Sequence, residues 1–173
     1  TVCEEDGEVT VTGVHGATSS DGGTLDIYGG TFTSTEFYGL YVSNDGAGAA
    51  PKKAAVNIYG GEFTGPSYSV WLGSDVNDPV DSVINIWGGV FHKDIMLQEN
   101  AETSVAIRIY GGTYGKALKE SLLASGYHQV KNGDQTYTVQ AQSPSASVGD
   151  RSFASLEDAF RAARDGETIT MLK

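Results

Sequence analysis

The sequence of 173 residues has few of the residues on which several common protein classes depend. A single cysteine, Cys3, leaves no pair for an internal disulfide and no set of thiolates for a zinc site. No apolar run approaches the roughly 20 residues of a membrane-spanning helix, so we expect no membrane insertion. Only 11 basic residues stand against 22 acidic ones, and the net charge is −11. We therefore expect no nucleic-acid partner, because such a protein needs a basic surface to displace counterions from phosphates.

Proline is also scarce, whereas glycine is abundant. The chain has four prolines and 23 glycines among its 173 residues, against a usual glycine share of about 7%. Hydrophobic residues make up 39% of the chain, which is enough for a packed core. This composition predicts short strands that are separated by tight turns.

Four segments of the sequence align without gaps. Each has alternating apolar and polar residues, then an aromatic residue, two glycines and, two residues later, another aromatic residue. The segments are residues 25–32 (LDIYGGTF), 56–63 (VNIYGGEF), 84–91 (INIWGGVF) and 107–114 (IRIYGGTY), and a fainter copy precedes them at residues 9–13. Four matches of this length indicate a true repeat.

The alternation within each segment predicts a strand with one buried face. In the first segment Leu25 and Ile27 point inward, Asp26 and Tyr28 point outward, and the glycine pair permits a bend with positive φ before Phe32 turns back inside. A second apolar run follows in the first three units, at residues 38–42, 68–72 and 94–97. A unit is thus predicted to contain a strand, a glycine bend, a second strand and a loop. Stacked units bury a shared interior and pair each strand with its copies.

These residues resemble the Gly-Gly-aromatic repeats of right-handed parallel β-helix regions in large cell-surface, adhesin-like proteins of Gram-positive gut bacteria. The resemblance covers most of residues 9–115. It implies an all-β fold, a right-handed parallel β-helix (solenoid) of about four coils, and an extracellular location on the bacterial surface.

The repeats are expected to span residues 1–115, followed by a capping helix and hairpin at 116–140. A helix is predicted from Lys116 to Ser125, and Asn132-Gly133 predicts a hairpin turn between two strand-like runs. Residues 141–173 are expected to form a linker and a small α/β appendage, which is a strand–helix–strand unit. Its helix is predicted to be capped by Ser155. The helix is also predicted to bury one stripe of side chains, Leu156, Ala159, Phe160 and Ala163. This appendage would begin a following module, so we expect the chain to be part of a longer, multi-module protein.

Stacking of the repeats would arrange equivalent outward residues in columns. Flat aromatic rings suit sugar rings, and neighbouring amides and carboxylates suit sugar hydroxyls. The candidate ligand-binding residues are Tyr28, Tyr59, Trp87 and Tyr110 in one column, Tyr41 and Trp71 in a second, and Asp26, Asn57 and Asn85 beside the first. The alternative is that the aromatic columns only stabilise the fold, because pairs of stacked rings contribute about 0.5–1.5 kcal/mol.

No cofactor is expected, apart from weak candidates for a calcium site. Asp75, Asn77, Asp78 and Asp81 cluster in one loop between repeats, and calcium takes six to eight oxygen ligands. They lack EF-hand spacing, however, and such residues are also ordinary turn formers.

The function predicted is a non-catalytic surface module that acts as an adhesin-like binding domain or a spacer. Its partner would be a host glycan or a host protein such as mucin or immunoglobulin. The alternative is a carbohydrate-active β-helix enzyme, a polysaccharide lyase or hydrolase, or its binding subdomain. Against an enzyme, we find no recognisable carboxylate pair, and His15, His92 and His128 have no metal-binding or triad spacing. In favour of an enzyme, Arg108 alone offers a basic residue, and it lies in the outward column that also holds Asn85.

Overall fold

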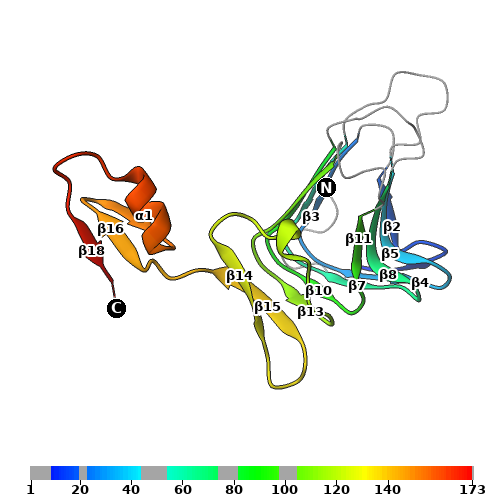
Figure 1. The fold of residues 1–173 in the computed structure, drawn as a ribbon. Helices are drawn as coiled ribbons and strands as arrows, with labels where there is room; N and C mark the ends of the chain where they lie inside the picture. The colour runs from blue at the N-terminus through cyan, green and yellow to red at the C-terminus, as the bar shows by residue number, and fades with distance from the viewer. Residues whose placement is uncertain (1–8, 20–22, 44–53, 74–81, 98–104, 173) are drawn as a thin grey trace. The chain divides into compact units, whose positions relative to one another are not determined.

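The computed structural model describes residues 9–19, 23–43, 54–73, 82–97 and 105–172 (Figure 1). Strands dominate this part of the chain, and several of the sheets that they form are parallel. The chain divides into two compact units, Thr1–Gln140 and Ala141–Lys173. In the described part no helix has the length and apolar character to cross a membrane.

The first unit contains three sheets, and its strands are short, as the glycine content predicts. The first sheet consists, in spatial order, of β1 (Thr10–Gly13), β4 (Thr31–Ser34), β7 (Glu62–Thr64), β10 (Val90–Phe91), β13 (Thr113–Tyr114), β15 (Tyr137–Ala141) and β14 (Tyr127–Lys131). The second consists of β11 (Ile95–Leu97), β8 (Tyr68–Gly73), β5 (Tyr38–Ser43) and β2 (Ala17–Ser19). The third consists of β12 (Val105–Ile109), β9 (Ser82–Ile86), β6 (Ala55–Ile58) and β3 (Thr24–Ile27).

Consecutive strands from β1 to β13 visit the three sheets in turn, so that neighbours within a sheet are equivalent strands of successive repeats. All of these neighbouring pairs are parallel. In the third sheet Leu25 pairs with Val56, Val56 with Ile84, and Ile84 with Ile107. The stacking of the four repeats in one register, which the sequence predicts, is therefore confirmed.

Each repeat contains one strand more than the sequence predicts. The stretch after the glycine pair was expected to form a single further strand, but in the first complete repeat it forms β4 and β5, with a bend at residues 35–37 between them. The Ser34 hydroxyl accepts hydrogen bonds from the backbone N–H groups of Glu36 and Phe37, which holds the chain in this bend. Apolar alternation alone does not reveal such a corner.

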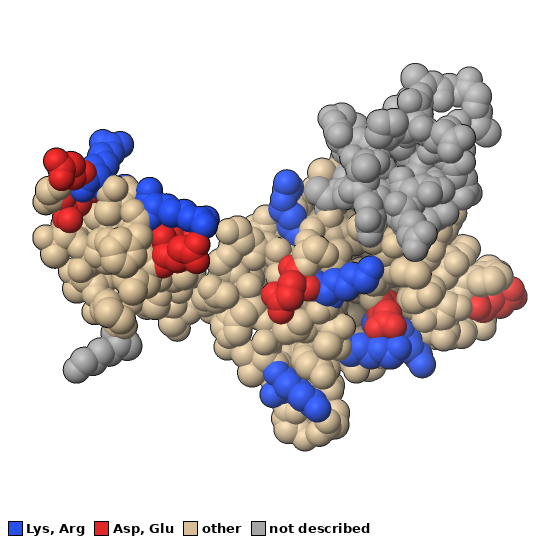
Figure 2. All heavy atoms as spheres, in the orientation of Figure 1, with Lys and Arg blue, Asp and Glu red and all other residues tan. Residues whose placement is uncertain are grey.

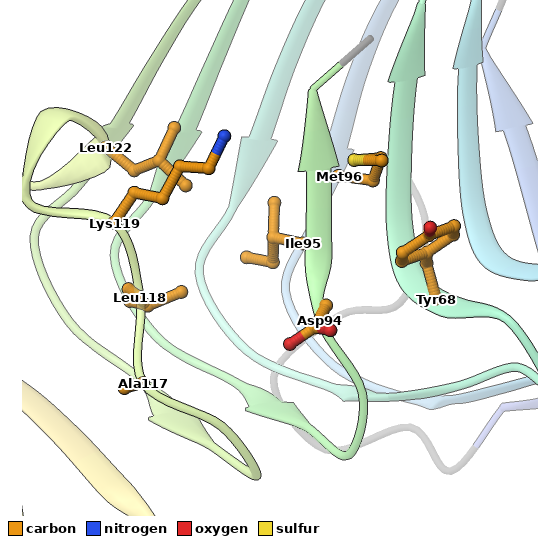
Figure 3. Close-up of a pocket in the computed structure, with 8 residues that line it drawn as sticks. All are labelled: Tyr68, Asp94, Ile95, Met96, Ala117, Leu118, Lys119 and Leu122. Atoms are coloured by element: carbon orange, nitrogen blue, oxygen red, sulfur yellow. The ribbon is translucent and has the colours of Figure 1, made fainter.

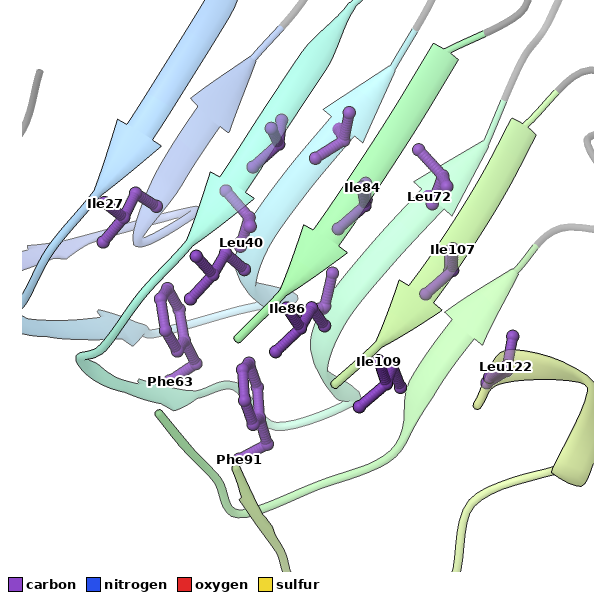
Figure 4. Close-up of a cluster of buried hydrophobic side chains, with 14 of the residues drawn as sticks. Ile27, Leu40, Phe63, Leu72, Ile84, Ile86, Phe91, Ile107, Ile109 and Leu122 are labelled. Atoms are coloured by element: carbon purple, nitrogen blue, oxygen red, sulfur yellow. The ribbon is translucent and has the colours of Figure 1, made fainter. Parts of the chain in front are cut away.

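Side chains from all three sheets meet in one core, and Figure 4 shows them pointing into the space that the sheets enclose. Phe32, Phe63, Phe91 and Tyr114 form a buried stack, with ring centroids 5.0, 5.1 and 4.9 Å apart along the series. These separations match the spacing of about 4.8 Å between neighbouring strands. The Tyr114 hydroxyl donates a hydrogen bond of 2.7 Å to the Gly111 carbonyl, and burial raises the pKa of this phenol.

The two glycines of a pair have different roles, and the first is required only where another repeat precedes it in the stack. The second glycine has positive φ in all four repeats, for example 110° at Gly89, a conformation that other residues rarely adopt. The first glycine lies close to the backbone of the preceding repeat, and a Cβ atom at Gly88 would come within 2.5 Å of the Tyr59 carbonyl oxygen. The repeat motif thus encodes both a bend and a close approach between successive repeats.

The faint copy of the motif at residues 9–13 does not occupy the place in the repeat that the sequence suggests. Its glycine suggests alignment with the strand that precedes each glycine pair, but β1 pairs with β4, which follows the pair. Val11 consequently stands beside Phe32, in the position of the second aromatic residue of the motif. Short Val-x-Val patterns fit either strand of the repeat, so the pattern by itself does not decide between them.

The helix predicted from Lys116 to Ser125 is wrong, because the structure has only a 3₁₀ turn, η2 (Glu120–Leu122), in this stretch. The Gln129 side chain accepts from the Leu118 N–H and donates to the Leu118 carbonyl, both at 2.8 Å. It thereby occupies the Leu118 carbonyl, which in a helix would accept a hydrogen bond from the Leu122 N–H. Leu122 is nevertheless buried in the core, and Leu123 forms a parallel bridge with Ile109 at the end of the third sheet.

The predicted hairpin is confirmed, although its turn differs from a simple Asn-Gly turn. Strands β14 and β15 are neighbours, and β15 pairs antiparallel with β13 at the end of the first sheet. Within the turn Gln135 has φ of 70°, and the Asp134 carboxylate accepts hydrogen bonds from the Thr136 N–H and hydroxyl. The left-handed position therefore falls on Gln135 and not on Gly133.

The second unit is a small three-stranded sheet with one helix. Its sheet order is β17 (Arg151–Phe153), β16 (Ala146–Val148) and β18 (Ile169–Met171), and its helix is α1 (Leu156–Ala162). The predicted cap is confirmed, because the Ser155 hydroxyl oxygen accepts from the Asp158 N–H at 3.1 Å. The predicted burial of Phe160 is wrong, since this side chain is 64% exposed while Ala159 is fully buried. The small core of this unit involves Leu156, Ala159 and Ala163 from the helical segment and leaves Phe160 outside.

Candidate functional site

The first predicted aromatic column follows the ends of β3, β6, β9 and β12. Tyr28, Tyr59 and Trp87 are 43%, 44% and 47% exposed. The rings of Tyr28 and Tyr59 stack at 4.8 Å, and those of Trp87 and Tyr110 stack at 3.9 Å between centroids. Stacking covers one face of each of these rings, and the edge-on contact of Tyr127 with Tyr110, at 5.3 Å, further encloses the last pair. This geometry fits a stabilising ladder of rings better than a platform for a sugar.

The polar column beside these rings is also bonded within itself. The Asn57 amide donates to the Asp26 carboxylate at 2.8 Å, and the Asn85 amide donates to the Asn57 carbonyl oxygen at 2.9 Å. Asn57 therefore uses both of its polar atoms within the column. This leaves fewer groups for the hydroxyls of a ligand, whereas Arg108, the next residue of the column, is exposed.

The second predicted column, on the sheet of β2, β5, β8 and β11, lies in a different environment. Tyr41 and Trp71 are register partners, and their rings stack at 4.9 Å. Tyr38 stacks on Trp71 at 5.4 Å and on Tyr41 at 5.8 Å. Together with His15 and Phe37, these residues line an open hollow of about 320 Å³, which we call the aromatic hollow.

His15 adds a polar group to the aromatic hollow. Its imidazole stacks on Tyr41 at 4.8 Å, with an angle of 16° between the planes, and on Tyr38 at 5.5 Å. The Nδ1 atom is shielded from solvent and makes no hydrogen bond to any residue that the structure describes. A buried polar atom without a partner costs about 1–3 kcal/mol, so the stacked position of His15 is held against this cost by its ring contacts.

Sequence reasoning found two of the five residues of the aromatic hollow and missed His15, Phe37 and Tyr38. His15 lies between β1 and β2, outside the repeat motif, so its position in the sequence gives no indication of this contact. A weak indication existed for Tyr38, because it pairs in register with Tyr68 of the next repeat. Phe37, which is 43% exposed, lies in the bend between β4 and β5.

The acidic and basic side chains of the described residues are spread over the surface. Among them no group of three or more His, Cys, Asp and Glu side chains is placed to hold a metal ion. On the face in Figure 2 acidic and basic side chains are interspersed and form no patch of one sign. The His92 imidazole and the Glu62 carboxylate are joined by a hydrogen bond of 2.6 Å on the surface. The calcium candidates Asp75, Asn77, Asp78 and Asp81 all lie outside the described residues.

We compared the chain with models of protein families, with curated proteins and with solved structures, and it matches none of them.

Proposed function

We propose that the first unit is a right-handed parallel β-helix and that it serves as a non-catalytic binding module of an adhesin-like protein on a bacterial surface. The cyclic order of the strands through three parallel sheets supports the solenoid, and parallel crossovers are almost always right-handed. The bacterial-surface setting rests on the Gly-Gly-aromatic repeats alone. In this proposal the solenoid holds a binding surface in place, and a glycan of the host is its partner.

The observation that carries the binding function is the aromatic hollow. Ligand sites are concave, with aromatic walls and a few polar groups that orient the ligand. The hollow combines the rings of Phe37, Tyr38, Tyr41 and Trp71 with the imidazole of His15, whose Nδ1 lacks a partner among the described residues. An apolar face of a sugar packs on the rings while its hydroxyls bond to the polar atoms that the hollow exposes. A volume of about 320 Å³ suits one or two sugar rings.

The proposal chooses between the two aromatic columns. Rings stack in both columns, but those from Tyr28 to Tyr110 lie beside a polar column that is hydrogen-bonded within itself, whereas the half-buried rings of Tyr41 and Trp71 line a hollow. The second column opens into the hollow and brings a histidine with it. We therefore assign recognition to Tyr41 and Trp71 and a stabilising role to Tyr28, Tyr59, Trp87 and Tyr110.

A matched pair of substitutions tests this assignment. Trp71→Ala removes a wall of the hollow, whereas Trp87→Ala removes an exposed ring from the other column. The chain is first screened on an array of mucin-type and other host glycans, and the affinity of the best glycan is then measured by calorimetry. We expect Trp71→Ala to weaken binding about tenfold or more, which corresponds to about 1.4 kcal/mol, while Trp87→Ala changes it less than about twofold. Circular dichroism melts check that both variants remain folded.

Three results would contradict the proposal. Equal losses of glycan affinity in Trp71→Ala and Trp87→Ala would show that the hollow has no special role in binding. Binding to mucin or immunoglobulin that survives enzymatic removal of their glycans would make a host protein the partner. Release of new reducing ends or unsaturated products from a polysaccharide during the assay would favour the carbohydrate-active enzyme.

A further inference from the structure

The three parallel sheets of the first unit do not end in the same way. In the first sheet the parallel series ends with β13, which is covered by antiparallel β15. The third ends with β12, where Leu123 forms a parallel bridge with Ile109 and the Ala124 N–H donates to the Ile109 carbonyl at 3.0 Å. The second ends with β11, which pairs with β8 on one edge and with no strand of the described residues on the other. The chain thus covers two of the three equivalent edges with extended segments.

The free edge of β11 has the backbone groups to bind another strand. Successive residues of a strand direct their N–H and C=O groups to opposite edges, so the three residues Ile95–Leu97 include at least one whose amide faces away from β8. Such unpaired edge groups are a template for the addition of a strand. The free edge alone defines the backbone geometry of an occupant but not its side chains.

A cavity of about 290 Å³ adjoins this edge. Figure 3 shows Ile95 directed from β11 toward Leu118 and Leu122, which lie on the segment that passes the end of the sheet, and Met96 on the opposite side of the strand. Ile95 and Leu97 continue the inward columns of Val70 and Leu72. Both are only partly buried, unlike those two partners. A further strand with apolar residues at alternate positions would complete both columns.

The charged groups around the cavity indicate one more property of the occupant. Asp94 is paired with Lys116 at 2.7 Å, and this hydrogen bond raises the pKa of the lysine. Lys119 also lines the cavity and has no carboxylate within ion-pair distance among the described residues. Among the described residues that line the cavity, Lys119 is thus a positive charge without an ion-pair partner, which favours a carboxylate on the occupant.

We propose that the free edge of β11 and the adjoining cavity form an acceptor groove for an extended segment of a partner protein, with apolar side chains at alternate positions and a carboxylate opposite Lys119. The segment adds a strand to the second sheet, its apolar side chains cover Ile95 and Leu97, and its backbone pairs with the free edge. This is recognition by β-strand addition, in which backbone hydrogen bonds provide affinity and alternate side chains provide specificity. It does not depend on the aromatic hollow.

A synthetic peptide of the required pattern, SETVTVTES labelled with a fluorophore, tests the groove by fluorescence anisotropy with the full chain. A second peptide, SETVPVTES, replaces the central threonine by proline and so lacks a backbone donor. Two charge reversals on the protein form a matched pair, Lys119→Glu at the cavity and Lys131→Glu at the exposed end of β14. Hydrogen exchange of the Ile95–Leu97 amides reports directly on the edge.

We expect saturable binding of the first peptide, slower amide exchange within Ile95–Leu97, and at least a fivefold loss for the proline peptide. Lys119→Glu should weaken binding about fivefold, because an attractive exposed pair becomes a repulsive one, whereas Lys131→Glu should leave it within about twofold. The proposal is overturned if the first peptide shows no saturable binding at about millimolar concentration, or if both peptides bind equally. Unchanged exchange at Ile95–Leu97 would also overturn it. So would sedimentation showing that the free chain forms dimers through this edge, since a second copy would then be the occupant.

Discussion

Replacing Gly88 by alanine places a methyl group against the backbone of the preceding repeat. The new Cβ atom would lie 2.5 Å from the Tyr59 carbonyl oxygen, whereas ordinary contacts begin at about 3.4 Å. Gly29 occupies the same position in the motif, but β3 is the last strand of its sheet and a Cβ atom at Gly29 meets nothing within 4 Å. Neither glycine is among those with positive φ. The same substitution at equivalent positions therefore isolates the close approach between stacked repeats.

The structure predicts that the two substitutions change the free energy of unfolding in opposite directions. The strands must separate by almost 1 Å at Gly88, and such overpacking costs about 1–3 kcal/mol of the free energy of unfolding. At Gly29 the methyl group is tolerated, and the lower entropy of the unfolded chain stabilises the protein by about 0.4–1 kcal/mol. The two variants should therefore differ by about 1.5–4 kcal/mol.

Urea denaturation followed by tryptophan fluorescence measures this difference. The chain has two tryptophans, Trp71 and Trp87, and both belong to the first unit. Relative to the unchanged protein, we expect a lower urea midpoint for Gly88→Ala and an equal or higher midpoint for Gly29→Ala. The slope m, with which the free energy of unfolding falls with urea concentration, should stay the same. Equal shifts in the two midpoints would refute the claim that stacking of the repeats makes the first glycine necessary.

Two further predictions concern the turns and the second unit. Gln135→Gly should stabilise the protein by about 1 kcal/mol, because φ of 70° strains any residue with a Cβ atom. A thermal melt measures this gain as a higher melting temperature. The control variant Gln140→Gly, which lies within β15, should lower the melting temperature instead. Hydrogen bonding from the Arg164 N–H and the pairing with Arg151 lower the pKa of Glu167 in the folded state. The stability that Glu167 contributes is therefore fully present above its ordinary pKa of 4.5 and is lost as the pH falls through the lower, folded value. The protection of the β16 amides against exchange, taken relative to the intrinsic rate at each pH, should fall over that range, and Glu167→Gln should reduce this change. The same pH dependence of the protection in both proteins would contradict the prediction.

The repeat itself made much of the first unit predictable. Alternation with period two is a local property, and the four copies of the motif align in sequence as they stack in space, so that the register of Leu25, Val56, Ile84 and Ile107 follows from the alignment. The turn glycines were predictable for the same reason, since a bend with positive φ needs no distant partner. The cap of α1 by Ser155 is likewise local.

The features that sequence reasoning missed depend on contacts between distant residues. The stretch after Lys116 has a helical pattern, but the Gln129 side chain competes for the backbone of Leu118. Phe160 fits a buried stripe of the helix, but the small core of the second unit does not extend to it. In both cases a local preference was overridden by the surroundings that the folded chain provides.

Taken by itself, the sequence determined that equivalent strands stack and which side chains point inward, because both follow from a short motif that recurs. Only the tertiary structure decided which outward residues lie together. The aromatic hollow joins His15, from a connection before the first repeat, to Tyr38 and Trp71 from successive repeats. Among the described residues, the edge of β11 likewise has no partner strand because the segment after β13 covers the other two sheets instead. Such neighbours are set by the spacing of stacked strands and by the path of the chain at the end of the repeat, and neither is encoded in the period of the motif.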